Sequence, residues 1–378
     1  MQLRSALPTL TLLIIALLVI QPANATSYPL TIPFGRSWPI SVVVDSARGF
    51  AYLDATSGDY PPTGFSFGVI NVTSHELVKT LALNEVPGPM ALDQASGDVY
   101  VAGTSSIAIL DGSNQTFTRQ IEVGRPILSM AHDGTVSRDV FFTSGDSVFA
   151  LDPLTGRIVG NATVEGGAGG VALDSNNGRL YVGQYPVGAI AVFQASTLAP
   201  IGAISLPSCC ASQFALDTHT QILIATSGSS SVFMVDASTD RFVKSVQVAP
   251  SGQNSTNAIA FDNNTGRVYV ATSPGGSIVE LDGTSGAVVG TLRTVSQVAG
   301  LAIDAKTHEL YATDYHQVTV FDASRSRVFL LLLVVGGAVV VVGVGLVYVI
   351  IKRRDMRERA EMQGRWRKTE AERPERRA

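Results

Sequence analysis

Histidine is the side chain best suited to acid–base chemistry near neutral pH, and in this 378-residue chain it is scattered. His75, His132, His219, His308 and His316 lie far apart in the sequence, and no two share the H-x-x-x-H spacing of zinc ligands on one helix face. The sequence also contains no G-x-S-x-G nucleophile motif and no glycine-rich phosphate loop. It therefore predicts no catalytic residue, no metal site and no cofactor.

Aspartate recurs in a pattern that indicates a different chemistry. Apart from Asp54–Gly58, six segments fit D-x-x-x-G, in which the Asp side chain can cap a turn and the Gly can adopt the left-handed conformation that closes it. A calcium loop of the type D-x-[DN]-x-[DN]-G would need more oxygen ligands than these segments offer, so we interpret them as structural turns. The segments are Asp45–Gly49, Asp93–Gly97, Asp152–Gly156, Asp174–Gly178, Asp262–Gly266 and Asp282–Gly286.

The two cysteines of the chain are adjacent, Cys209 and Cys210. In an exported protein such a pair can oxidise to a vicinal disulfide, although neighbouring Cα atoms at about 3.8 Å are closer than in most disulfides. A vicinal bridge and two free thiols are both consistent with the sequence. A bridge between two molecules is less favoured.

The elements that would position these residues come from a repeat. One phrase returns seven times, and its first Asp falls every 40 to 48 residues, a period typical of repeat architectures. In the cleanest copy, Ala258–Leu292, four alternating segments at 258–262, 267–272, 277–282 and 287–292 are separated by polar turns. This pattern predicts one antiparallel four-stranded sheet. The seven positions are Asp45, Asp93, Asp133, Asp174, Asp217, Asp262 and Asp304.

Seven such sheets packed radially give an all-β fold, a seven-bladed β-propeller over residues 26–322. The last copy supplies only three strands, at 300–304, 309–313 and 317–322, and Leu30–Pro39 matches the end of a repeat. We therefore expect the N-terminal strand to pair as the outermost strand of the last blade, which would close the ring and remove its open edges.

Three of the repeats are similar to one another at register: DVYVAGTSSIAILD (98–111), RLYVGQYPVGAIAVF (179–193) and RVYVATSPGGSIVELD (267–282). They resemble the YVTN-type β-propeller repeats of exported and surface-layer-like proteins, over roughly Leu30–Asp322. The resemblance implies the fold and says little about function, since the family is a scaffold with many uses. Units three and five lack the Tyr and have Val140–Phe142 and Ile222–Ile224 there.

Both ends of the chain are apolar. Residues 1–25 have the features of a signal peptide, with Arg4, an apolar core and an Ala23-Asn24-Ala25 cleavage site. A short linker at 323–327 leads to Val328–Ile351, where 24 residues without a charge are long enough to cross a hydrocarbon core of about 30 Å as a helix. The basic segment 352–378 follows, which predicts a single-pass protein of the cell membrane with its propeller outside and its C-terminus in the cytoplasm.

The predicted tail carries 11 basic and 6 acidic residues, and without it and Arg4 the chain's net charge changes from −4 to −10. An acidic exterior argues against binding to nucleic acid. The predicted partners are the membrane and, outside it, a cell-envelope glycan or protein. Five N-x-[ST] sequons mark candidate glycosylation sites at Asn71, Asn114, Asn161, Asn254 and Asn263.

The D-x-x-x-G turns should lie on one face of the ring, hereafter the turn face. The connections between second and third strands and between blades should lie on the other, hereafter the loop face. Because the chain would leave the turn face toward the membrane, we expect the loop face to bind ligands. The function favoured is non-enzymatic binding or adhesion, and the alternative is a membrane-tethered lyase or oxidoreductase acting on the loop face. The longest insertion, Asp54–Ser66, is expected as a loop on that face. The candidate binding residues there are Arg36, Trp38, Tyr60, Arg125, Tyr185, Asp314, Tyr315 and His316.

Overall fold

The protein is described by a computed structural model, which covers residues 28–35, 37–58, 62–132, 134, 138–250, 255–314 and 317–324, together with tail residues 352, 353, 356, 357 and 361. The chain divides into two compact units, Met1–Asp322 and Ala323–Ala378. In the second unit the described residues Lys352, Arg353, Met356, Arg357 and Glu361 are helical. The predicted signal peptide and membrane span lie outside the described residues.

Among the residues that the structure describes, no helix is both long and apolar enough to cross a membrane.

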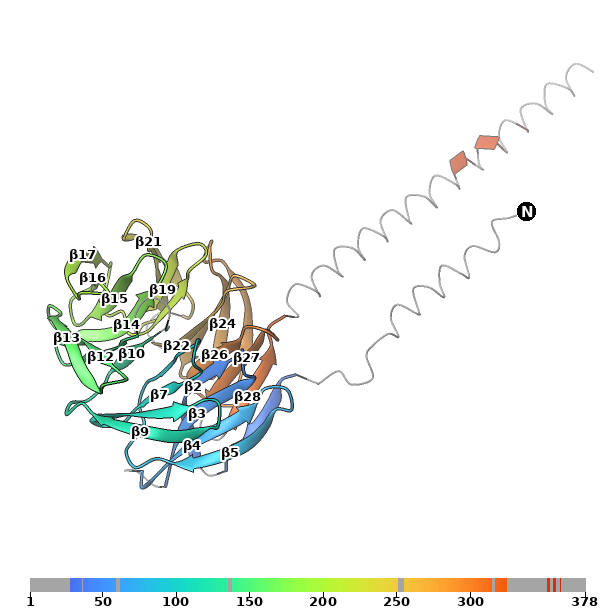
Figure 1. The fold of residues 1–378 in the computed structure, drawn as a ribbon. Coiled ribbons are helices and arrows are strands. Elements are labelled where there is room, and N and C mark those ends of the chain that lie inside the picture. Colours follow the sequence, from blue (N-terminus) through green and yellow to red (C-terminus); the bar gives the residue numbers. More distant parts are fainter. Residues whose placement is uncertain are drawn as a thin grey trace, which may run out of the picture. The chain divides into compact units, whose positions relative to one another are not determined.

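The first unit is a seven-bladed propeller, as predicted. Its seven antiparallel sheets have four strands each, and the innermost strands of neighbouring blades contact one another around a common centre (Figure 1). In chain order, blades 1 to 3 comprise β2 (Ser37–Asp45), β3 (Phe50–Ser57), β4 (Gly64–Asn71) and β5 (Glu76–Ala82); β6 (Met90–Leu92), β7 (Val99–Ala102), β8 (Ser106–Asp111) and β9 (Thr116–Glu122); and β10 (Ser129–Ala131), β11 (Val140–Ser144), β12 (Ser147–Asp152) and β13 (Arg157–Thr163).

The later blades repeat this order from the inner to the outer strand. Blades 4 to 6 comprise β14 (Ala168–Asp174), β15 (Arg179–Gln184), β16 (Ala189–Gln194) and β17 (Pro200–Ser205); β18 (Phe214–Asp217), β19 (Ile222–Thr226), β20 (Ser231–Asp236) and β21 (Arg241–Gln247); and β22 (Ser255–Asp262), β23 (Arg267–Ser273), β24 (Ser277–Asp282) and β25 (Val288–Arg293). Blade 7 comprises β26 (Val298–Asp304), β27 (Glu309–Asp314), β28 (Gln317–Asp322) and, from the other end of the chain, β1 (Leu30–Pro33).

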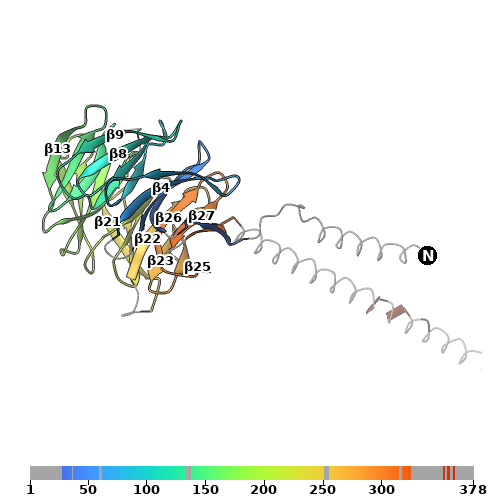
Figure 2. The same cartoon turned by 90° about the horizontal axis from the view of Figure 1, so that it is seen from below.

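Strand β1 closes the ring, as the incomplete last repeat predicts. It pairs antiparallel with β28, with Thr31 opposite Thr319. Ile32 and Phe34 are 3% and 5% exposed and pack among the apolar side chains of blades 7 and 1. Blue and orange strands consequently lie side by side in both views (Figures 1 and 2).

The repeated Tyr packs between blades. Tyr52, Tyr181, Tyr269 and Tyr311 are almost completely buried, and Phe141 and Ile224 fill the same place in the two units that lack it. The hydroxyl of Tyr181 donates to the Ala237 carbonyl of blade 5 at 3.0 Å. The repeat therefore keeps a large side chain at a position where it fills the wedge between two sheets.

The insertion Asp54–Ser66, expected as a long loop, is mostly strand. Ala55, Thr56 and Ser57 pair with Ser66, Phe65 and Gly64, so that β3 and β4 simply extend beyond the length of the other blades. The backbone groups of this segment continue the hairpin ladder, and only a short connection remains between the strands.

Candidate functional site

The turn face is built to hold the ring together. All six predicted glycines have positive φ, between 64° and 81°, and in five of the six turns the Gly N–H donates to the carbonyl of the Asp. Gln221 and His308 take the same left-handed position after Asp217 and Asp304, which the D-x-x-x-G pattern did not include. The Asp side chains accept backbone N–H groups of their own turns, as in Asn264 N to Asp262 Oδ1 at 3.0 Å. These Asp residues are therefore turn caps.

Side-chain donors tie the first turns of blades 1, 4 and 6 to a carbonyl of the following blade. Arg48 donates to Ala95, Asn176 to Thr218, and Asn264 to Ala305. Lys306 of blade 7 donates to Ala47 of blade 1 at 2.9 Å, which continues this belt across the closure. Polar groups of the turn face are thus used to hold neighbouring blades in place.

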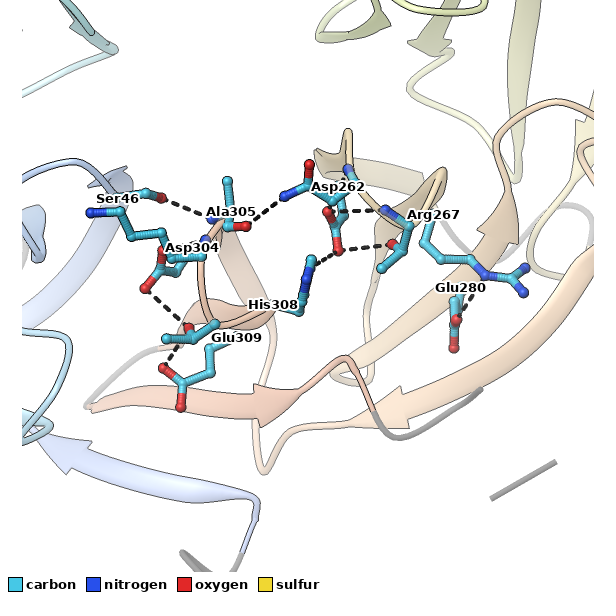
Figure 3. A network of polar contacts seen from close by, with 12 residues as sticks. Ser46, Asp262, Arg267, Glu280, Asp304, Ala305, His308 and Glu309 are labelled. Atoms are coloured by element: carbon cyan, nitrogen blue, oxygen red, sulfur yellow. Dashed lines mark hydrogen bonds and ion pairs between the residues drawn. The ribbon is translucent and has the colours of Figure 1, made fainter. Parts of the chain in front are cut away.

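Histidines and carboxylates do meet on the turn face, around the seam between blades 6, 7 and 1 (Figure 3). Nδ1 of His308 lies 2.9 Å from Oδ2 of Asp262, which joins blade 7 to blade 6. Nε2 of His75 lies 3.0 Å from Oε1 of Glu309, which joins blade 1 to blade 7. The Tyr28 hydroxyl donates to the same Glu309 oxygen and fixes the chain just before β1.

Within the described ranges, no three His, Cys, Asp or Glu side chains are grouped closely enough to hold a metal ion. The seam contacts join different blades, and Asp262 also accepts the Thr265 hydroxyl at 2.8 Å. Their geometry is that of a structural clamp at the point where the ring closes.

Four of the eight predicted binding residues are described by the structure, and these four come from different parts of the ring: Trp38, Arg125, Tyr185 and Asp314. Tyr185 is 61% exposed in the connection between β15 and β16. Arg125 lies with its guanidinium carbon 4.3 Å from the centre of the Phe149 ring, and Trp38 is half-buried in β2, opposite Thr56. Asp314 is only 1% exposed and accepts the amide of Gln317, so it belongs to the blade interior. Arg36, Tyr60, Tyr315 and His316 lie outside the described residues.

Tyr185 borders a groove of about 500 Å³, hereafter the Tyr185 groove. Its walls come from three successive blades: the β11–β12 connection at Gly145, the segment 166–169, Tyr185 and Pro186, and the segment 210–212. In the last of these segments Cys210 contributes to the lining, and Cys209 and Cys210 form a disulfide. The groove therefore brings together Tyr185 and the cysteine pair, which the sequence could only place separately.

The disulfide-bearing segment rests on glycines. An added Cβ at Gly183 would overlap the carbonyl oxygen of Ala211, and one at Gly170 would overlap that of Ser212. The same segment is tied to blade 5 by Ser212 N–H donating to the Thr226 carbonyl at 3.0 Å. Backbone rests directly on backbone here, so the floor of the groove is held in one place.

Two other hollows open among the loops. The central channel, of about 260 Å³, is lined by Ser41 and Ser129 of innermost strands and by Ser212 and Gln213 just before β18. A pocket of about 280 Å³ lies beside Glu85 between blades 1 and 2. Partial desolvation would raise the pKa of this carboxyl, but hydrogen bonds led by the Ser106 hydroxyl hold its pKa below the usual value. Glu85 is thus an ionised anchor for the β7–β8 connection.

Neither Glu85 nor the glycines of the Tyr185 groove were among the site residues expected from the sequence. The signal for the groove was the segment Glu165–Gly170, which has four glycines among six residues where a repeat would otherwise continue. Such a cluster indicates close approach of another backbone or an uncovered peptide surface. Nothing comparable marks Glu85, whose partners Ser105 and Ser106 come together with it only through folding.

No protein-family model matches the chain, and no curated protein matches it. The solved structure of U3-55K is similar to it, with a TM-score of 0.65 and 11% sequence identity over 77% of this chain and 97% of that chain. At this level of identity the likeness concerns the fold alone.

Proposed function

We propose that this protein is an exported, membrane-anchored propeller that binds a component of the cell envelope at its loop face. The observation that carries this proposal is the Tyr185 groove, which offers an exposed aromatic ring above a fixed floor. Concave sites with a few aromatic side chains are the usual form of binding sites in preformed scaffolds.

Three features support export and anchoring. The disulfide between Cys209 and Cys210 suits an oxidising compartment. The first residues of the chain have the pattern of a signal peptide, and Val328–Ile351 is apolar over the length of a membrane span. The similarity to YVTN-type repeats, a prediction from the sequence, agrees with an exported scaffold.

The division between the two faces supports binding on the loop face. Both Leu30, where β1 begins, and Asp322, where β28 ends, lie on the turn face of blade 7, because β1 and β28 run antiparallel. A membrane anchor that follows Asp322 would hold the turn face toward the bilayer. The loop face is then free for a partner.

A capture experiment tests this function. Full-length protein in detergent is immobilised and exposed to a solubilised envelope fraction of the organism that makes it, and Tyr185→Ala is compared with Leu154→Ala, an exposed residue of the turn face. We expect Leu154→Ala to capture as wild type does and Tyr185→Ala to lose most of the captured material. Equal capture by all three proteins would contradict the proposal.

Protease accessibility on the two sides of the membrane tests whether the protein is anchored. Protease added to intact cells should cleave the propeller and spare the segment 352–378, which should become accessible only after the membrane is opened. Extraction of the protein by alkaline carbonate without detergent would contradict the anchor.

A further inference from the structure

We propose that the Tyr185 groove binds a neutral saccharide, a short stretch of an uncharged envelope polysaccharide. This inference rests on the proposed function and names the ligand class of the same site. It follows from the shape, polarity and charge of the groove lining.

The walls offer flat apolar surfaces. The Tyr185 ring is 61% exposed, the Pro186 ring next to it in the chain is also exposed, and Leu128, which also lines the groove, is 54% exposed. A pyranose ring has one face made of C–H groups, which is apolar and flat. Exposed aromatic rings bind such faces while the sugar hydroxyls remain at the edge of the contact.

Peptide groups supply the polar partners. Gly145, Gly166, Gly167 and Gly169 line the groove and have no side chains to cover their backbone. Their positions are fixed by hydrogen bonds between the walls, from Ala168 N–H to Gly145 O at 2.9 Å and from Tyr185 N–H to Gly167 O at 3.0 Å. A carbonyl has two lone pairs, so each of these acceptors can also receive a sugar hydroxyl.

The charges in and around the groove disfavour an anionic ligand, and the described lining offers no charged partner for an ionic one. Among the described residues that line the groove, none carries a charged side chain. Asp146 and Glu165 are exposed next to Gly145 and Gly166, and they would repel an anionic polymer. A neutral ligand with apolar faces and many hydroxyls matches this lining better than a nucleotide, an acidic glycan or a fatty acid.

The site is preformed. The glycine contacts under residues 210–212 leave the disulfide-bearing segment little room to move, so binding would order few additional groups. Binding sites that need no ordering lose less affinity to entropy, which matters for a ligand held by weak stacking and neutral hydrogen bonds.

Calorimetric titration of the full-length protein in detergent tests the ligand class. The probes are maltotetraose, cellotetraose, mannotetraose and chitotetraose as neutral tetrasaccharides, with tetragalacturonate and tetralysine as charged oligomers of equal length. We expect at least one neutral tetrasaccharide to bind. Tyr185→Ala should weaken that binding at least tenfold, while Tyr185→Phe, which keeps the ring, and Leu154→Ala should leave it within twofold.

The outcomes separate this inference from the proposed function. If Tyr185→Ala abolishes envelope capture but no neutral tetrasaccharide binds or competes, the groove binds a different ligand class and the inference is wrong. Preferential binding of tetralysine would overturn it in favour of a basic peptide. If Tyr185→Ala captures envelope material as well as wild type does, both the proposed function and this inference are wrong.

Discussion

Replacing Asp54 by Thr should make the stability of the propeller less dependent on pH. Asp54 is completely buried in β3, with one oxygen accepting Ser41 N–H at 2.9 Å and the other, Oδ2, without a hydrogen-bond partner among the described residues. Burial raises the pKa of Asp54 to about 7 from its ordinary 3.8, against the hydrogen bonds from Ser41 that lower it. Thr226 and Thr313 occupy this position in blades 5 and 7 and accept equivalent N–H groups at 3.0 and 2.8 Å.

The size and sign of Asp54's effect on the unfolding free energy follow from proton linkage. Well below pH 3.8, Asp54 is protonated in both the folded and the unfolded chain and has no linkage cost. Between pH 4 and 7 the unfolded chain releases a proton that the folded chain retains, so the unfolding free energy falls by about 1.4 kcal/mol per pH unit. Above pH 7 the loss stays at its maximum of about 4 kcal/mol, an upper bound because water penetration and relaxation reduce it.

Urea unfolding of a 26–322 fragment, followed by circular dichroism at pH 4.5 and pH 8, measures this effect. The variant should gain stability relative to wild type by about 1 to 3 kcal/mol more at pH 8 than at pH 4.5. Asp146→Thr, at an exposed site, serves as the control and should show no such difference. A variant whose offset from wild type is the same at both pH values would refute the reasoning about the buried carboxyl.

Three further perturbations test the ring and the groove. Deleting residues 26–34 removes the buried side chains of Ile32 and Phe34 and should lower the unfolding free energy by about 3 to 6 kcal/mol in urea titrations; an unchanged midpoint would contradict closure by β1. Glu309→Ala removes the acceptor shared by Tyr28, His75 and Thr307 and should cost about 2 to 4 kcal/mol, whereas Glu165→Ala at an exposed site should be nearly neutral; equal effects would refute the clamp at the seam. Gly183→Ala should displace the segment 210–212 and reduce envelope capture several-fold; capture at the wild-type level, with the fold intact by circular dichroism, would show that this floor is not needed.

Much of the fold could be predicted because the same pattern of strands and turns recurs seven times in the sequence. The turn residues Asp and Gly, the alternating strands and the missing last strand each indicated a closed ring, and β1 pairs with β28 as expected. The pattern failed where other residues adopt the expected backbone conformation and where a strand continues past its expected end. Gln221 and His308 adopt positive φ without being Gly, and the expected loop after Asp54 continues the strand ladder.

The site could be predicted only in part. Tyr185 was expected on the loop face, but its association with Cys210 depends on two connections of neighbouring blades that are 25 residues apart in the sequence. Asp314 was expected at the rim, and its burial follows from strand register, which places its side chain near Gln317 and Thr319. Whether side chains from different connections meet depends on how neighbouring blades are oriented. Local sequence patterns do not determine that orientation.

Hydrogen–deuterium exchange of the full-length protein, with and without captured envelope material, tests most directly whether the loop face is the binding surface. Binding at the loop face should slow exchange in the segments 165–169, 185–188 and 206–213 and leave the turns around Asp262 and Asp304 unchanged. Protection confined to those turns, or none on the propeller, would contradict it.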